Sequence, residues 1–214
     1  MPSQAYRKFL YNTLDVDRLI SSHNILSPSS RGRRGLGHIT RSGVVLLCAA
    51  WEVYVEELVV ECSQYLANSF FNPNELPVPV KKNLAKFIKE HKNELKLLEL
   101  GGSGWRDVYI NYCKDNATKI NTPKPTILDP LYKQLIGLDG LSDFWSCGAD
   151  YIKDFVGVRG GIAHNGRSSG YVTVRELIEY RDTILFTAKE TDNQICDYAF
   201  GAVRSTIQPW RKLR

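Results

Sequence analysis

The sequence predicts an all-α fold, a single antiparallel helical bundle over residues 1–214. Two observations lead to this prediction. In most of the chain apolar residues recur every three or four positions, as they do on the buried face of a helix. No stretch alternates between apolar and polar residues for long enough to predict a strand. The composition, 43% hydrophobic and 24% charged, is that of an ordered chain with one sizeable core or two small ones.

The N-terminal part, residues 1–37, is expected to hold one helix and a loop in front of a core bundle formed by residues 38–200. Residues 3–22 carry apolar side chains at helical spacing, which predicts an amphipathic helix. Residues 27–37 are rich in Ser, Gly and Arg, which is typical of a flexible loop.

The strongest helix prediction covers residues 39–69. Its apolar side chains recur at helical spacing over the whole length: Val44, Leu47, Cys48, Trp51, Val55, Leu58, Cys62 and Leu66. Because the stretch from Val44 to Trp51 is apolar on every face, we expect other helices to surround it completely. The second half carries four glutamates that we interpret as a solvated flank, namely Glu52, Glu56, Glu57 and Glu61, of which Glu52 adjoins the buried half.

Proline and glycine divide the rest of the chain into shorter elements. The predicted elements are helices 80–99 and 105–120, a proline-pinned connector 121–130, and helices 131–137 and 142–159. Leu95 and Leu98 in the first of these helices, and Phe144 in the last, are expected to face inward. Glycines follow residue 159, and Thr173 to Glu176 then match a capping box, which predicts a final helix to about Phe200.

The net charge of +5 is concentrated near the N-terminus. Residues 1–42 hold seven Lys and Arg against two Asp and Glu, whereas the remaining residues balance. The excess centres on Arg31, Arg33 and Arg34, which could attract the phosphates of RNA. The alternative interpretation is a solvated loop with no ligand.

Cysteine usage and hydropathy predict a cytoplasmic protein without a membrane span or metal site. The five cysteines are odd in number and widely spaced, which is typical of reduced, mostly buried thiols. No pair of Cys or His has the spacing of zinc ligands. The longest strictly apolar run, Gly43 to Trp51, has nine residues, whereas a membrane helix needs roughly 20. No signal-peptide pattern is visible at the N-terminus.

The candidate site is the segment from Val158 to Gly166, in which Arg159 precedes His164 by five residues. Two other Arg–His pairs have the same spacing but lie on a surface helix and in the basic loop. Only Arg159 and His164 lie between two apolar helices with small residues between them, where a large ligand can approach. The alternative is that Arg159 caps helix carbonyls and His164 is a histidine at a hinge.

The sequence resembles the HEPN proteins, and most closely the branch called RiboL-PSP-HEPN. The resemblance covers roughly residues 38–190 and rests on three segments: Arg41 to Leu58, which is similar to the long early helix of the family, Asp129 to Trp145, and Arg159 to His164, which falls where the family carries its R-x4-6-H motif. The residue after the motif Arg is commonly Asn, Asp or His in the family, and here it is Gly160.

The resemblance implies an all-α bundle that forms a homodimer and acts as an endoribonuclease without a metal or other cofactor. Members commonly belong to toxin–antitoxin or anti-phage defence systems, so an antitoxin or another regulatory protein is a further expected partner besides RNA. Arg159 and His164 are the expected catalytic residues, and Asn165 is a supporting hydrogen-bonding group. Histidine suits proton transfer near neutral pH, and arginine suits a phosphate, since its charge is permanent.

Three other functions remain open at this point. Some family members lack nuclease activity, so the chain could be a non-catalytic HEPN module that binds nucleotide, RNA or a partner protein. It could also be a structural protein that assembles through the apolar early helix. DNA binding is a further alternative, although no helix-turn-helix spacing stands out.

Overall fold

The computed structural model describes residues 1–27, 35–203 and 206–214, and over these residues the chain is helical without a strand. The α-helices are α1 (Gln4–Leu26), α2 (Gly37–Ser69), α3 (Val78–Lys89), α4 (Trp105–Ala117), α5 (Pro125–Leu135), α6 (Ala149–Asn165) and α7 (Val174–Val203). Short 3₁₀-helices lie between them: η1 (Pro73–Glu75), η2 (Glu94–Leu100), η3 (Leu141–Phe144) and η4 (Gly166–Ser168). The predicted all-α fold class is confirmed.

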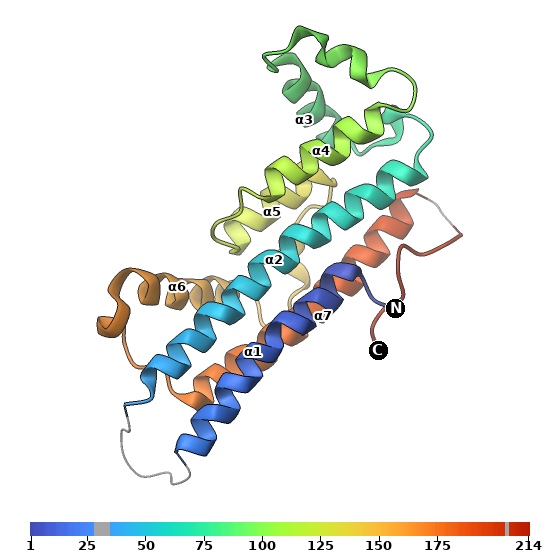
Figure 1. Cartoon of the computed structure of the whole chain (residues 1–214). Helices are drawn as coiled ribbons and strands as arrows, with labels where there is room; N and C mark the ends of the chain where they lie inside the picture. The colour runs from blue at the N-terminus through green and yellow to red at the C-terminus, as the bar shows by residue number, and fades with distance from the viewer. Residues whose placement is uncertain (28–34, 204–205) are drawn as a thin grey trace.

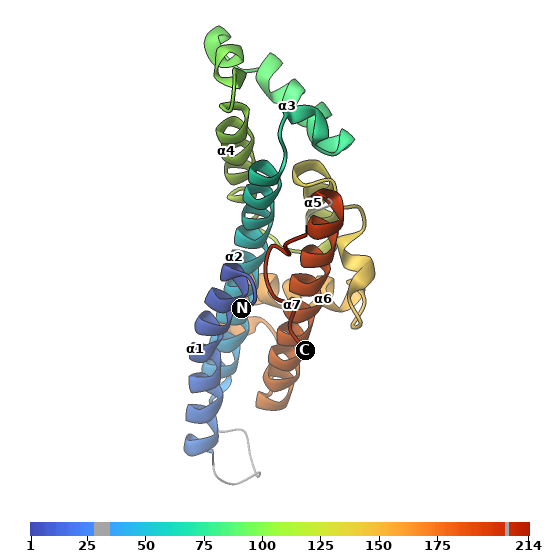
Figure 2. The same ribbon diagram turned by 90° about the vertical axis from the view of Figure 1, so that its right-hand side faces the viewer.

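The long helix α2 is the centre of the structure (Figures 1 and 2). It contacts α1, α4, α5, α6 and α7. Leu47, Trp51 and Leu58 are completely buried, and burying a side chain of this size contributes roughly 1.5–3 kcal/mol. The predicted range 39–69 is therefore correct to within two residues at its start. The expectation that every face is covered is wrong, because Leu46 is 42% exposed.

Aromatic side chains join segments that are far apart in sequence. The rings of Trp51 and Trp145 meet edge to face, with centroids 5.7 Å apart. The Trp51 indole donates a hydrogen bond to the Pro123 carbonyl, and the Trp145 indole donates one to the hydroxyl of Thr191 in α7. The Tyr54 hydroxyl donates to the Ala188 carbonyl, also in α7. These bonds satisfy the polar atoms of the buried rings and fix how α2 lies against its neighbours.

The predicted helix 80–99 is interrupted. α3 ends at Lys89, and the chain continues after a short loop as η2. Leu95 and Leu98, which were expected to face inward, are 65% and 75% exposed. In a 3₁₀-helix the side chains repeat every three residues rather than every 3.6, so an apolar pattern with the α-helical period no longer maps onto one buried face.

Two boundaries in the second half of the chain also differ from the prediction. α5 begins at Pro125, inside the expected connector, because proline fits the first turn of a helix, where its missing N–H is not needed. The expected helix 142–159 is divided into η3 and α6, separated by Gly148 with φ +78°. Phe144 is 44% exposed rather than inward.

The capping box at the start of α7 is confirmed. The Glu176 backbone N–H donates to the Thr173 hydroxyl at 3.1 Å, and the Thr173 backbone N–H donates to the Glu176 carboxylate at 2.7 Å.

The five cysteines are all unpaired thiols, and four of them are buried, as expected. Burial raises the pKa of the Cys48 and Cys113 thiols to about 12, so both stay protonated.

The two ends of the chain meet over α7. The Arg211 N–H donates to the Met1 carbonyl, and the Trp210 indole donates to the Asp192 carbonyl. The Asp192 side chain is completely buried. One of its oxygens accepts a hydrogen bond from the Ser3 hydroxyl, and the other has no partner among the described residues. Burial raises the pKa of Asp192 from its ordinary value of 3.8 to about 6.

The described helices are too short or too polar to span a membrane. Within residues 1–27, 35–203 and 206–214, none of them combines the length and the apolar composition that crossing a bilayer requires.

Candidate functional site

The Arg–His segment lies inside the last two turns of α6 rather than behind a helix end. α6 continues through Gly160 and Gly161 and ends at Asn165, where Gly166 adopts φ +52°. The predicted end at residue 159 is therefore wrong. Both side chains of the pair are held on one rigid helix, which fixes their separation.

Arg159 is half-buried where α6 packs against α2. Its electrostatic partners there are Glu52 and Cys48. Burial raises the pKa of the Glu52 carboxyl, and the nearby guanidinium of Arg159 lowers it again, so that the net shift is upward. Oε2 of Glu52 is buried and has no hydrogen-bond partner among the described residues. A guanidinium and a carboxylate are thus close enough to interact across α2 and α6, and one carboxylate oxygen is left without a donor.

The position of Glu52 differs from the one that the sequence predicts. It was interpreted as part of a solvated flank, and instead it is half-buried beside Arg159. One feature of the sequence could have indicated that Glu52 is buried: it directly follows Trp51, at the border of the buried half of the helix. A glutamate at such a border is buried whenever another helix crosses there, and here the crossing helix is α6.

His164 is exposed in the last turn of α6 and points away from the core. Residues five apart on an α-helix differ by about 140° around the axis and about 7.5 Å along it. Arg159 and His164 therefore leave α6 on different faces. The structure brings Arg159 to Glu52 and leaves His164 on the surface.

The face of α6 that carries His164 is otherwise formed by glycine. Gly157, Gly160 and Gly161 precede His164 by seven, four and three residues, the spacing that puts side chains on one helix face. A Cβ atom added at any of the three would meet no atom within 4 Å. Each glycine costs an exposed helix about 0.5–1 kcal/mol relative to alanine, and no close contact with the described residues requires a glycine at these positions.

Asn165 lines a cavity of about 410 Å³ between α6, η4 and the start of α7. The other walls include Ile162, Tyr171 and Tyr180. Arg159 and His164 are not among its lining residues, so the predicted supporting residue and the two predicted catalytic residues lie on three different sides of the helix end.

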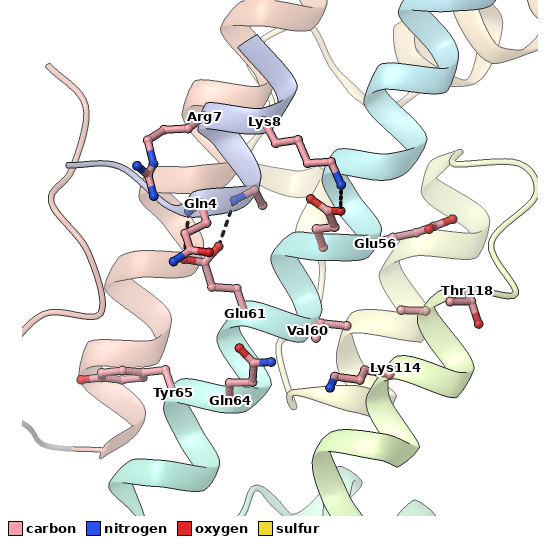
Figure 3. Close-up of a pocket in the computed structure, with 13 residues that line it drawn as sticks. Gln4, Arg7, Lys8, Glu56, Val60, Glu61, Gln64, Tyr65, Lys114 and Thr118 are labelled. Atoms are coloured by element: carbon pink, nitrogen blue, oxygen red, sulfur yellow. Dashed lines mark hydrogen bonds and ion pairs between the residues drawn. The ribbon is translucent and has the colours of Figure 1, made fainter. Parts of the chain in front are cut away.

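A larger cavity, of about 850 Å³, lies along α2 on the side of α1 and α4 (Figure 3). In Figure 3, Gln4 and Lys8 enter it from α1, and Lys114 enters from α4. Two of its glutamates hold α1 in place, since Glu61 accepts hydrogen bonds from the first backbone N–H groups of α1 and Glu57 pairs with Lys8. Carboxylates stabilise the N-terminus of a helix in this way. The cavity therefore lies along the seam between α1 and α2, and α4 forms a third wall.

Glu56 lies one turn after Glu52 and faces the same seam. Burial, followed by the nearby charges of Glu52 and Glu57, raises the pKa of its carboxyl to about 7. The four glutamates of α2 are thus half-buried rather than a fully solvated flank, and two of them, Glu57 and Glu61, contact α1.

The basic cluster Arg31, Arg33 and Arg34 lies outside the described residues. Its predicted role in binding RNA therefore stays a prediction.

Among the described residues, no three His, Cys, Asp or Glu side chains lie together in a way that could hold a metal ion.

Comparison with known proteins identifies one family. The family model described as RiboL-PSP-HEPN matches residues 11–197, which include α2, the whole of α6 and most of α7. Comparisons with curated proteins and with solved structures gave no match.

Proposed function

Because this chain belongs to the RiboL-PSP-HEPN family, we propose that it is a metal-independent endoribonuclease whose active unit is a homodimer. The observation that carries the proposal is the arrangement on α6. Arg159 lies within electrostatic range of Glu52, and His164 stands exposed on a face of glycines where an added Cβ atom would meet none of the described atoms within 4 Å.

The proposed reaction uses the ribose 2′-OH as the nucleophile. An imidazole of His164 takes the 2′-OH proton while the 2′-oxygen forms a bond to the adjacent phosphorus. The bond from phosphorus to the 5′-oxygen breaks, and the leaving oxygen takes up a proton from a second, protonated imidazole. Arg159 binds the phosphate through two N–H groups and stabilises the charge that builds up on its oxygens. The products are a 2′,3′-cyclic phosphate and a 5′-hydroxyl.

A second copy of the chain supplies what one copy lacks. One chain offers a single imidazole at the motif, and its arginine lies on a different face of the helix. A two-fold axis next to the glycine face would let two α6 helices approach closely, because no side chain stands between their backbones. The two His164 side chains, and an arginine from each chain, could then surround one phosphate.

Glu52 is the proposed positioning residue for Arg159. Its carboxylate attracts the guanidinium from α2, which restricts the rotamers that Arg159 can adopt before RNA binds. Because Glu52 touches neither the nucleophile nor the leaving group in this scheme, its effect on cleavage is indirect.

The direct test is RNA cleavage in the presence of EDTA. We expect the purified protein to cleave single-stranded RNA under these conditions and to leave a 2′,3′-cyclic phosphate on the upstream product, identified by mass spectrometry. A product with a free 3′-hydroxyl would contradict the mechanism. The second candidate function is a non-catalytic HEPN module, and the observation that favours it is Gly160, which stands where the family commonly has a polar residue. Tight binding of RNA or nucleotide without turnover would support this second function.

The glycine face provides a second test, which separates stability from assembly. Gly157→Gln replaces an exposed helical glycine with a good helix former, so we expect the variant to gain about 0.5–1 kcal/mol of stability per chain. The same side chain stands where the second α6 would approach, so dimerisation and cleavage should both decline. Thermal unfolding, sedimentation velocity and cleavage rates measure the three effects.

Gly201→Gln is the matched control for this variant, because Gly201 is also an exposed helical glycine with open space around it, but on α7. It should leave dimerisation and cleavage unchanged. If Gly157→Gln remains fully dimeric and active, the glycine face of α6 is not the interface.

A further inference from the structure

The segment formed by α3 and η2 projects from one end of the structure (Figures 1 and 2). It is held to the rest of the chain by contacts of α3 with α5 and of η2 with α4. α6 lies toward the opposite end in Figure 1. Whatever this projection does is therefore spatially separate from the Arg–His segment.

An apolar groove of about 540 Å³ runs between α3 and η2. Its apolar walls are Leu76, Leu84, Ala85, Ile88, Leu97 and Leu100. The base of the groove is firmly packed, since Leu76, Leu84 and Ile88 are at most 7% exposed. Leu97 on the rim is 63% exposed. An open apolar groove of this size is uncommon on a soluble surface without a binding role.

The groove lies in a segment of positive net charge, and its lining includes two lysines, Lys81 and Lys89, against one glutamate, Glu94. Residues 76–101 contain six lysines and three glutamates. Four of the lysines, namely Lys82, Lys86, Lys89 and Lys92, are exposed and form no ion pair with the described residues. Lys89 also lines the groove itself. A ligand that neutralises these charges would gain electrostatic energy as well as apolar contact.

We propose that this groove, which we call the α3–η2 groove, binds an acidic amphipathic peptide segment of another protein. Large apolar side chains of the peptide fill the space between Leu84 and Leu97, and its Asp and Glu side chains lie over the lysines of α3. An amphipathic helix binds a hydrophobic groove in this way: its apolar side chains provide the affinity, and its charged side chains determine its orientation.

Charge and shape favour this occupant over three others. A second copy of the same groove lies in the same positively charged segment, so two copies would repel each other. RNA would match the lysines but not an apolar lining. A bilayer prefers a convex apolar surface that inserts between lipids, whereas the buried leucines here form the floor of a concavity.

The proposal can be tested by selection from a displayed library of random peptides of about fifteen residues, long enough for four helical turns. The full-length protein is the bait, and Leu97→Gln is used for counter-selection. We expect the enriched peptides to combine two or more large apolar residues with several Asp or Glu residues. Synthetic copies of them, labelled for fluorescence polarisation, should bind more weakly as the salt concentration rises.

Leu95 provides the matched control, because it is 65% exposed on the same 3₁₀-helix and does not line the groove. Leu97→Gln should weaken binding of a selected peptide about tenfold or more, as loss of a central anchor does, and Leu95→Gln should not. Circular dichroism of both variants checks the fold.

Three results would overturn the proposal. The first is that the wild-type protein enriches no peptide more strongly than the Leu97→Gln protein does. Another is enrichment of neutral or basic peptides. The third is binding of single-stranded RNA or phosphatidylglycerol vesicles that Leu97→Gln abolishes and a selected peptide does not displace. None of these outcomes depends on ribonuclease activity.

Discussion

Replacing His164 with alanine is expected to lower the rate of RNA cleavage by about 10²–10⁴, the usual effect of removing a general acid or base. The reason is that the proposed dimer has only two imidazoles at the phosphate, and the variant removes both. Because the His164 side chain is exposed and forms no hydrogen bond with the described residues, the fold and the dimer should persist. Cleavage of a fluorescent RNA in EDTA measures the loss.

His91→Ala is the control for this variant, since His91 lines the α3–η2 groove, and α3 lies far from α6 in Figure 1. It should cleave RNA at the wild-type rate. If His164→Ala is fully active, His164 has no role in the mechanism, and the motif formed by Arg159 and His164 is not the catalytic group.

Mixed dimers test whether the site is shared between chains. Arg159→Ala and His164→Ala homodimers should both be inactive. A heterodimer of the two still contains one arginine and one histidine, on different chains. If the site is composite, this heterodimer regains part of the activity. If each chain uses its own pair, the heterodimer stays as inactive as its parents.

The second large effect concerns stability and pH. The pKa of Asp192 is about 6 in the folded chain, against an ordinary value of 3.8, so the folded state binds the proton more tightly than the unfolded state. The stability linked to this proton is fully present below about pH 4 and is lost as the pH rises through 6. Two pKa units correspond to about 3 kcal/mol. We expect the free energy of unfolding to decrease by up to this amount between pH 4 and 7.

Asp192→Asn isolates this contribution, because its side chain is neutral at every pH. Relative to the wild type, the variant should become more stable as the pH rises from 4 to 7, measured by urea unfolding at each pH. Asp197→Asn changes an exposed carboxylate on the same helix, α7, and should follow the wild-type curve closely. If the stability difference between Asp192→Asn and the wild type does not vary with pH, the Asp192 carboxyl does not titrate between pH 4 and 7.

The sequence predicted the helices that carry a continuous apolar face. α2 and α7 were placed to within a few residues, since a long periodic pattern and a capping box are local signals. The interrupted helix 80–99 was not predictable, because the exposure of Leu95 and Leu98 depends on where α3 stops and on what packs beside it. Glycine was also misleading: Gly160 and Gly161 were interpreted as a helix end, and the structure retains them within α6.

The site was predictable as a pair of residue types and not as a geometry. Spacing and the neighbouring small residues singled out Arg159 and His164. The position of Glu52 beside Arg159 depends on α6 crossing α2 more than one hundred residues away in the chain, and no local pattern encodes that crossing. That the two motif side chains face different directions follows only once the segment is known to be helical.

The edge-to-face contact of Trp51 with Trp145 gives the chain a natural optical reporter. Two indoles at this separation couple their electronic transitions, so the near-ultraviolet circular dichroism should contain a signal that depends on their mutual orientation. The rings come from α2 and from the segment before α6, and they are anchored to the α4–α5 connector and to α7. Loosening any of these four segments would alter the spectrum without a label being attached.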